Sequence, residues 1–145
     1  MFLITDDMTQ KYLIDTSIWV DLYEDRRGFK NEPLGDYALN LLIKIKAKDS
    51  RVVLTDLLMR ELEVNYSIGE INGMFKPFEK QVEKIIVTKK QMEEAERIAS
   101  KRDIPPGDVL HAIIARDNAL ILITRDKHFK QIEDIAKHYR PEDIT

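Results

Sequence analysis

Residues 11–21 constrain the fold more than any other segment of this chain. Three apolar residues, 12–14, run directly into Asp15, and a helix-like pattern follows. A short, continuous apolar run is typical of a central strand in a parallel sheet, whose two faces are both buried. Asp15 would then stand at the carboxyl end of that strand, where open α/β sheets bind their ligands. We expect Asp15 to belong to a functional site and Ser17 to be the N-cap of the next helix.

Three further strand-like segments follow, each separated from the next by helical patterns. We expect strands at residues 51–54, 84–87 and 120–123, and helices that begin near residues 36, 56, 89 and 108, with a short helix after residue 126. Thr55 or Asp56 and Thr88 stand at capping positions. The segment from Gly69 to Gly73 should interrupt helical structure, and residues 75–82 should form another helix.

Alternating strands and helices of this kind predict an α/β fold. The central sheet should be mainly parallel, with four to five strands and helices on both faces. With 145 residues, the chain is long enough for one domain, 1–145, whose core spans about residues 11–132.

Composition excludes several classes of protein. There is no cysteine, which rules out a disulfide scaffold and a thiolate zinc site. No apolar run approaches the roughly 18 residues that span a bilayer, and residues 1–10 do not form a secretory signal, so a cytoplasmic protein is expected. The net charge of −3 argues against binding nucleic acid by bulk positive charge, but not against a nuclease whose acidic site binds a metal.

Four acidic residues should converge at one rim of the sheet. Asp15 ends the first strand, Asp126 follows the fourth, Asp108 opens the helix before it, and Glu61 lies in the helix after the second strand. Right-handed crossovers bring such positions to the same rim. Carboxylates this close raise each other's pKa, and a hard divalent cation such as Mg²⁺ or Mn²⁺ relieves the repulsion.

Each acid also has a purely structural explanation. Asp108 and Asp126 could be helix N-caps, and Glu61 could pair with a basic residue of its own helix. Asp15 is the hardest to explain in this way, because a strand-end acid after buried residues needs a partner. The prediction of a metal site therefore rests on the four acids together and not on any one of them.

We assign structural rather than functional roles to the histidines and to the tryptophan. His111, His128 and His138 lack the paired spacing of an acid–base couple, so we interpret them as surface or packing residues. Trp19 is expected in the core of the first helix rather than at a base-stacking surface.

Four blocks of the chain, residues 15–21, 54–62, 108–112 and 123–129, occur in an order that resembles the signature of PIN-domain ribonucleases. The likeness is greatest to the VapC-like toxins of prokaryotic toxin–antitoxin pairs, and it extends from about Tyr12 to Phe129. It implies a three-layer α/β/α sandwich that acts as a Mg²⁺- or Mn²⁺-dependent endoribonuclease. It also implies a homodimer and an antitoxin protein that fills the acidic groove.

The resemblance assigns roles to individual residues. The acidic quartet of the family matches Asp15, Glu61, Asp108 and Asp126. The hydroxyl groups that support the site match Thr16, Ser17 and Thr124. His128 departs from the pattern, because many relatives have an acid at this position, and the ligands of a second metal therefore stay open. Metal-activated water would attack an RNA phosphodiester in line and leave a 5′-phosphate and a 3′-hydroxyl.

Basic residues beside the quartet, Arg60, Arg125 and Lys127, could contact the RNA backbone, although ion pairs or a solvated surface explain them equally well. A receiver domain would need a lysine after the last strand, and a dehalogenase-type phosphatase would need an acid where Ser17 stands. The main alternative is a PIN-fold module that binds RNA or protein without catalysis.

Overall fold

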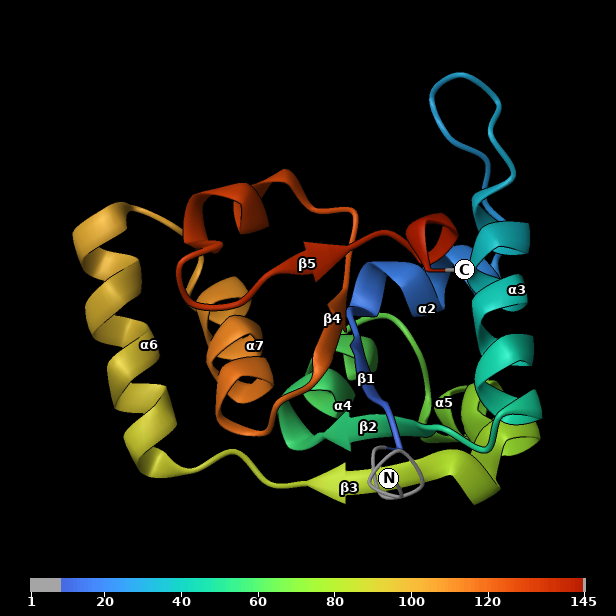
Figure 1. Ribbon diagram of the computed structural model, residues 1–145, viewed down its shortest axis with the longest axis horizontal. Coiled ribbons are helices and arrows are strands. Elements are labelled where there is room, and N and C mark those ends of the chain that lie inside the picture. Colours follow the sequence, from blue (N-terminus) through green and yellow to red (C-terminus); the bar gives the residue numbers. More distant parts are fainter. Residues whose placement is uncertain (1–8, 145) are drawn as a thin grey trace, which may run out of the picture.

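A five-stranded parallel sheet forms the centre of the computed structural model, which describes residues 9–144 (Figure 1). The strands, in the spatial order β3-β2-β1-β4-β5, are β1 (Lys11–Ile14), β2 (Arg51–Thr55), β3 (Val82–Ile85), β4 (Ile121–Ile123) and β5 (His138–Tyr139). Every pair of neighbouring strands runs parallel, and Tyr12 lies opposite Val52 on one side and Ile121 on the other. The predicted α/β class with a parallel central sheet is confirmed.

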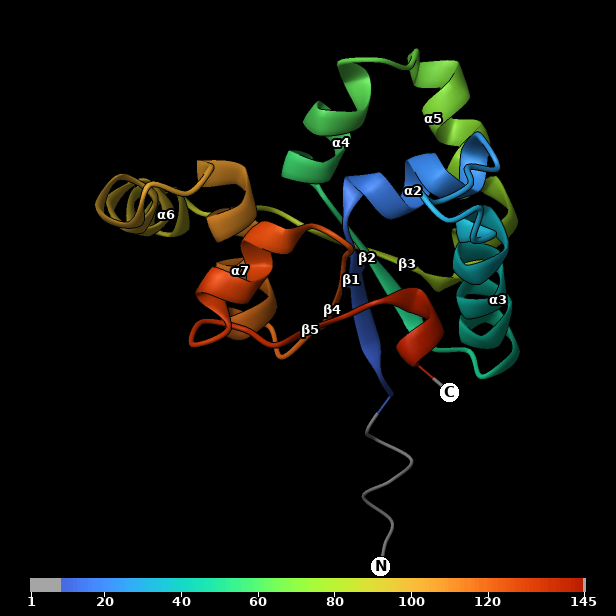
Figure 2. The same ribbon diagram turned by 90° about the horizontal axis from the view of Figure 1, so that it is seen from above.

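Helices cover both faces of the sheet, as Figure 2 shows. One side carries α2 (Thr16–Tyr23), α3 (Leu34–Ala47) and α5 (Ile68–Phe75), and the other carries α6 (Lys89–Arg102) and α7 (Pro106–Asp117). The helix α4 (Asp56–Glu63) and the 3₁₀ segments η1 (Lys76–Gln81), η2 (Lys127–Ile132) and η3 (Pro141–Asp143) complete the fold. Among residues 9–144, no helix has the length and apolarity that crossing a membrane requires.

The sheet separates two apolar cores, because neighbouring residues of a strand point to opposite faces. Leu13 packs with α6 and α7, whereas Tyr12 and Ile14 pack with α2, α3 and α5. Both faces of β1 are therefore buried, which explains its continuous apolar sequence. As predicted, Trp19 lies in a core, on the side of α2, α3 and α5. It is 1% exposed, and its ring centroid is 4.5 Å from that of Phe75.

Two expectations for the segment from residue 69 to residue 87 were wrong: the interruption of helical structure from Gly69 to Gly73 and the position of the third strand. The helix α5 runs through Gly69 and Gly73, because the capping box of Ser67 and Glu70 starts it and three of its apolar side chains are buried. The helix expected at residues 75–82 is present as the 3₁₀ helix η1, residues 76–81.

The third strand ends at Ile85 rather than at Val87. The reason is that the backbone N–H of Val87 donates to the side chain of Asp56 instead of to a neighbouring strand.

Candidate functional site

Asp15 is fixed at the rim by three hydrogen bonds to its carboxylate. The backbone N–H of Thr16 donates to Oδ1 at 2.8 Å, and the hydroxyl groups of Ser17 and Thr124 each donate to Oδ2 at 2.9 Å. The side chain is 10% exposed. Asp15 itself is the N-cap of α2, so the expectation that Ser17 would be the cap was wrong. The helix starts one residue earlier, at Thr16, and Ser17 supports the carboxylate instead.

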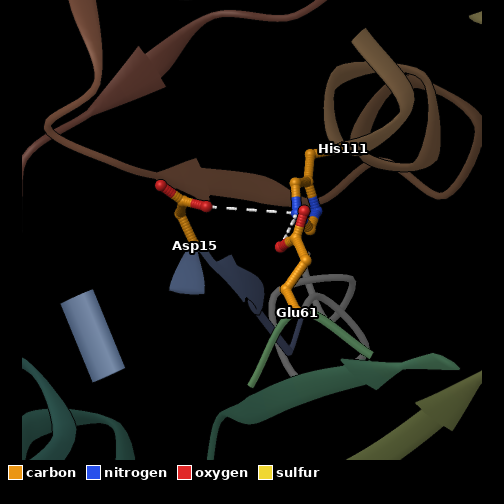
Figure 3. Close-up of side chains that lie close together, drawn as sticks. All are labelled: Asp15, Glu61 and His111. Carbon is orange, nitrogen blue, oxygen red and sulfur yellow. Dashed lines mark hydrogen bonds and ion pairs between the residues drawn. The ribbon is translucent and has the colours of Figure 1, made fainter. Parts of the chain in front are cut away.

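Glu61 projects from α4 toward Asp15. Its Oε1 accepts a hydrogen bond from the hydroxyl of Thr16 and lies 2.9 Å from Nε2 of His111, a contact visible in Figure 3. Burial favours the neutral form of this carboxyl, but the hydrogen bond and charge of His111, followed by the hydrogen bond from Thr16, outweigh it. The pKa of Glu61 is therefore held below its usual value.

Asp108 and Asp126 form the second half of the site. Asp108 lies in the first turn of α7, and Asp126 precedes η2. Nδ1 of His128 is 3.0 Å from Oδ2 of Asp108 and 3.0 Å from Oδ1 of Asp126. Desolvation, and then the negative charges of Asp126 and Asp15, raise the pKa of Asp108 to about 6. Asp108 is thus close enough to both Asp126 and Asp15 to be repelled by their charges.

The structural explanations of the acids hold only in part. Asp126 does cap η2, because its Oδ1 accepts the N–H of His128 at 2.9 Å. Asp108 is not a cap, since the N-cap of α7 is Pro105. Glu61 contacts His111 of another helix, and within residues 9–144 it forms no ion pair with a basic residue of α4.

Two of the three histidines contact acids of the quartet. His128 is exposed, as the surface interpretation predicted, but neither contact was predicted. His111 is 1% exposed and contacts Glu61, and His128 contacts Asp108. His138 lies apart, 4.0 Å from a carboxylate oxygen of Glu133. One local signal was present in the sequence: His111 follows Asp108 by three residues, and side chains at this spacing share a helix face.

The three basic residues beside the quartet differ in their surroundings. Arg125 forms a bidentate ion pair with Glu142, at 2.5 and 2.8 Å, and lies 3.7 Å from Asp21, so the ion-pair explanation describes it. Arg60 and Lys127 are exposed.

The donor set fits a divalent cation. Two groups of side chains each bring three potential ligand atoms within 4.8 Å of one another: Asp15, Glu61 and His111 in one group, and Asp108, Asp126 and His128 in the other. No lysine or arginine in residues 9–144 forms an ion pair with any of the four acids. Carboxylate oxygens in such excess are suited to Mg²⁺ or Mn²⁺.

Comparisons with known proteins agree with this architecture. The sequence model of the PIN domain matches residues 12–135. No curated protein matches the chain.

Several solved structures are similar in fold. VapBC2 of Rickettsia felis, bound to a DNA fragment from the promoter, is 22% identical, with a TM-score of 0.59 over 85% of this chain and 93% of that one. A toxin–antitoxin complex from Klebsiella pneumoniae is 18% identical, with a TM-score of 0.62 over 89% and 98% of the two chains. FitAcB of Neisseria gonorrhoeae is 14% identical, with a TM-score of 0.57 over 90% and 97%.

Proposed function

This chain belongs to the PIN domain family, and from that premise we propose that it is a metal-dependent endoribonuclease, the VapC-like toxin of a toxin–antitoxin pair. One observation carries the proposal. Four carboxylates from four separate segments approach one another at the rim of the sheet without lysine or arginine partners among the described residues. Such a concentration of negative charge is costly unless a cation neutralises it.

The roles proposed for the side chains follow from their surroundings. Asp15, Asp108 and Asp126 would hold the ion, and Glu61 would bind it directly or through water. A bound Mg²⁺ or Mn²⁺ ion supplies Lewis-acid stabilisation of the phosphate charge and lowers the pKa of water. The hydroxyl groups of Ser17 and Thr124 keep the carboxylate of Asp15 in one orientation, so that no reorganisation is needed when the ion binds.

The substrate we propose is single-stranded RNA, cleaved to a 5′-phosphate and a 3′-hydroxyl. Arg60 and Lys127 are exposed next to Glu61 and Asp126 in sequence, and both could contact backbone phosphates. Arg125 is left out of this role because its guanidinium is paired with Glu142.

The partners we propose are an antitoxin protein and a second copy of the chain. Support for the antitoxin comes from the relatives, since the structures from Rickettsia felis and Klebsiella pneumoniae are described as a VapBC pair and a toxin–antitoxin complex. A small open reading frame next to the gene would be the first sign of such a partner.

The test is RNA cleavage by the wild type and by Asp126→Asn. Asparagine can still accept the N–H of His128 and cap η2, so the variant should fold. We expect loss of at least 100-fold of the Mn²⁺-dependent cleavage rate, with an unchanged circular dichroism spectrum. Asp36→Asn, which makes the same substitution at an exposed position in the first turn of α3, should cleave like the wild type.

Two results would contradict the proposal. One is full activity of Asp126→Asn, and the other is undiminished cleavage when EDTA is added to the wild type. Absence of any Mn²⁺ binding in calorimetry would instead favour a PIN-fold module that binds RNA or protein without catalysis.

A further inference from the structure

His111 is a polar residue in an otherwise apolar part of α7. The residues around it, from Val109 to Ala115, are buried, and the imidazole itself is 1% exposed. A buried polar ring is costly unless its nitrogen atoms are hydrogen-bonded. Yet Nδ1 of His111 has no hydrogen-bond partner among the described residues. Packing alone therefore does not account for a histidine at this position.

The other ring nitrogen faces the acidic site. Nε2 lies 2.9 Å from Oε1 of Glu61 and 3.9 Å from Oδ1 of Asp15. Dashed lines mark both contacts in Figure 3. A nitrogen lone pair directed at a carboxylate would be repelled, so Nε2 must carry a proton and donate it. Within the part of the chain that the structure describes, the one hydrogen bond of this ring is therefore made to Glu61 and orients its carboxylate.

Glu61 is confined on two further sides. Its Oε1 also accepts the hydroxyl proton of Thr16. Its Oε2 lies only 3.1 Å from the point that a Cβ atom would occupy at Gly107, so the missing side chain of Gly107 makes room for the carboxylate. These contacts hold the flexible side chain of Glu61 in one position. Its Oε1 accepts hydrogen bonds from two donors, whereas its Oε2 has no hydrogen-bond partner among residues 9–144.

We propose that His111 is a positioning residue, which holds Oε1 of Glu61 through Nε2–H and so leaves Oε2 available to a divalent cation. The inference rests on the proposed function, because it assumes that the site binds an ion. Groups that orient a metal ligand from the second coordination sphere change metal affinity by about 10- to 100-fold when they are removed.

The test is Mn²⁺ titration calorimetry with two substitutions of similar size. His111→Leu removes the donor, and we expect Mn²⁺ affinity to fall about 10-fold or more. His111→Gln places an amide N–H close to the position of Nε2 and should recover most of the affinity. If His111→Leu does not fold, His111→Met, which is unbranched and apolar, replaces it. The control is His138→Gln, at a histidine outside the site, which should bind Mn²⁺ like the wild type.

A double-variant cycle shows whether His111 acts through Glu61. Adding His111→Leu to Glu61→Ala should cause no further loss of Mn²⁺ affinity, because the group to be positioned is already gone. An equal loss in both backgrounds would overturn the proposal, since His111 would then act on the ion by itself. An unchanged affinity in His111→Leu, with only thermal stability altered, would also overturn it and assign His111 to structure.

Proton NMR gives a readout that needs neither metal nor RNA. The Nε2–H proton of His111 should give a slowly exchanging imidazole resonance in the wild type that is absent from His111→Gln and shifted in Glu61→Gln. If the wild type binds no Mn²⁺, the proposed function fails, whereas this resonance still reports whether the hydrogen bond to Glu61 exists. If the wild type binds Mn²⁺ and the resonance does not respond to Glu61→Gln, the positioning role alone fails.

Discussion

We expect Gly107→Ala to change the stability of the fold and the affinity for metal in opposite directions. Gly107 is the second residue of α7, and a Cβ atom there would lie 3.1 Å from Oε2 of Glu61, a few tenths of an ångström closer than ordinary contacts. A glutamate side chain without restraints could rotate away from the added methyl group. Here Oε1 is held by Thr16 and by His111, so the added methyl group must displace the carboxylate against two hydrogen bonds.

The two expected effects have opposite signs. Alanine is better than glycine in a helix interior by about 1 kcal/mol, and near a helix start we expect about half of that as added stability. Displacement of Glu61 should lower Mn²⁺ affinity by about 3- to 10-fold, which corresponds to about 0.7–1.4 kcal/mol. The variant should therefore be more stable than the wild type and yet bind the ion less tightly.

Urea denaturation and Mn²⁺ calorimetry measure the two quantities on the same protein. The matched control is Gly73→Ala in α5, where a Cβ atom meets nothing within 4 Å. It should stabilise the fold by up to about 1 kcal/mol and leave Mn²⁺ affinity unchanged. If Gly107→Ala also leaves Mn²⁺ affinity unchanged, Glu61 is not confined as we infer, and the reasoning is refuted.

Three more perturbations can be measured by denaturation. The pKa of Asp108 is raised to about 6, so the folded protein holds the proton of this carboxyl more tightly than the unfolded chain does. This difference stabilises the fold in full below about pH 4, and the stabilisation is lost as the pH rises through about 6. In the metal-free protein Asp108→Asn should remove this part of the pH dependence, and a slope unchanged between pH 4 and 7 would contradict the assignment. Trp19→Phe removes the hydrogen bond to the Ile14 carbonyl and leaves a cavity in the core, so it should lower the free energy of unfolding by about 2 kcal/mol. Unfolding can be monitored by circular dichroism. A decrease below about 0.5 kcal/mol would show that the core closes around the smaller ring. Arg125→Met removes the cation 3.7 Å from the buried Asp21 and the partner of Glu142, and it should cost about 2 kcal/mol. Equal stability would show that the ion pairs of Arg125 contribute nothing.

Much of the fold follows from local pattern. The apolar runs at residues 12–14 and 120–123 predicted buried parallel strands, because a strand covered on both faces has no polar side. Thr88, predicted at a capping position, caps α6 and forms a capping box with Gln91. The two-residue strand β5 had no such signal, because so short a strand has no periodicity and exists only through its pairing with β4.

The sequence by itself determined the class of fold and the place of Asp15, since both depend on where an apolar run stops and a helix starts. Only the tertiary structure decided how the charges are balanced. Glu61 and His111 are 50 residues apart and meet because α4 packs beside the start of α7 at the rim of the sheet. Periodicity reports which face of an element is buried, but not which side chains from distant elements come within hydrogen-bond distance there. For that reason the four acids could be named by reading the chain, whereas the only sequence signal we found for the histidines that contact them was the three-residue spacing of Asp108 and His111.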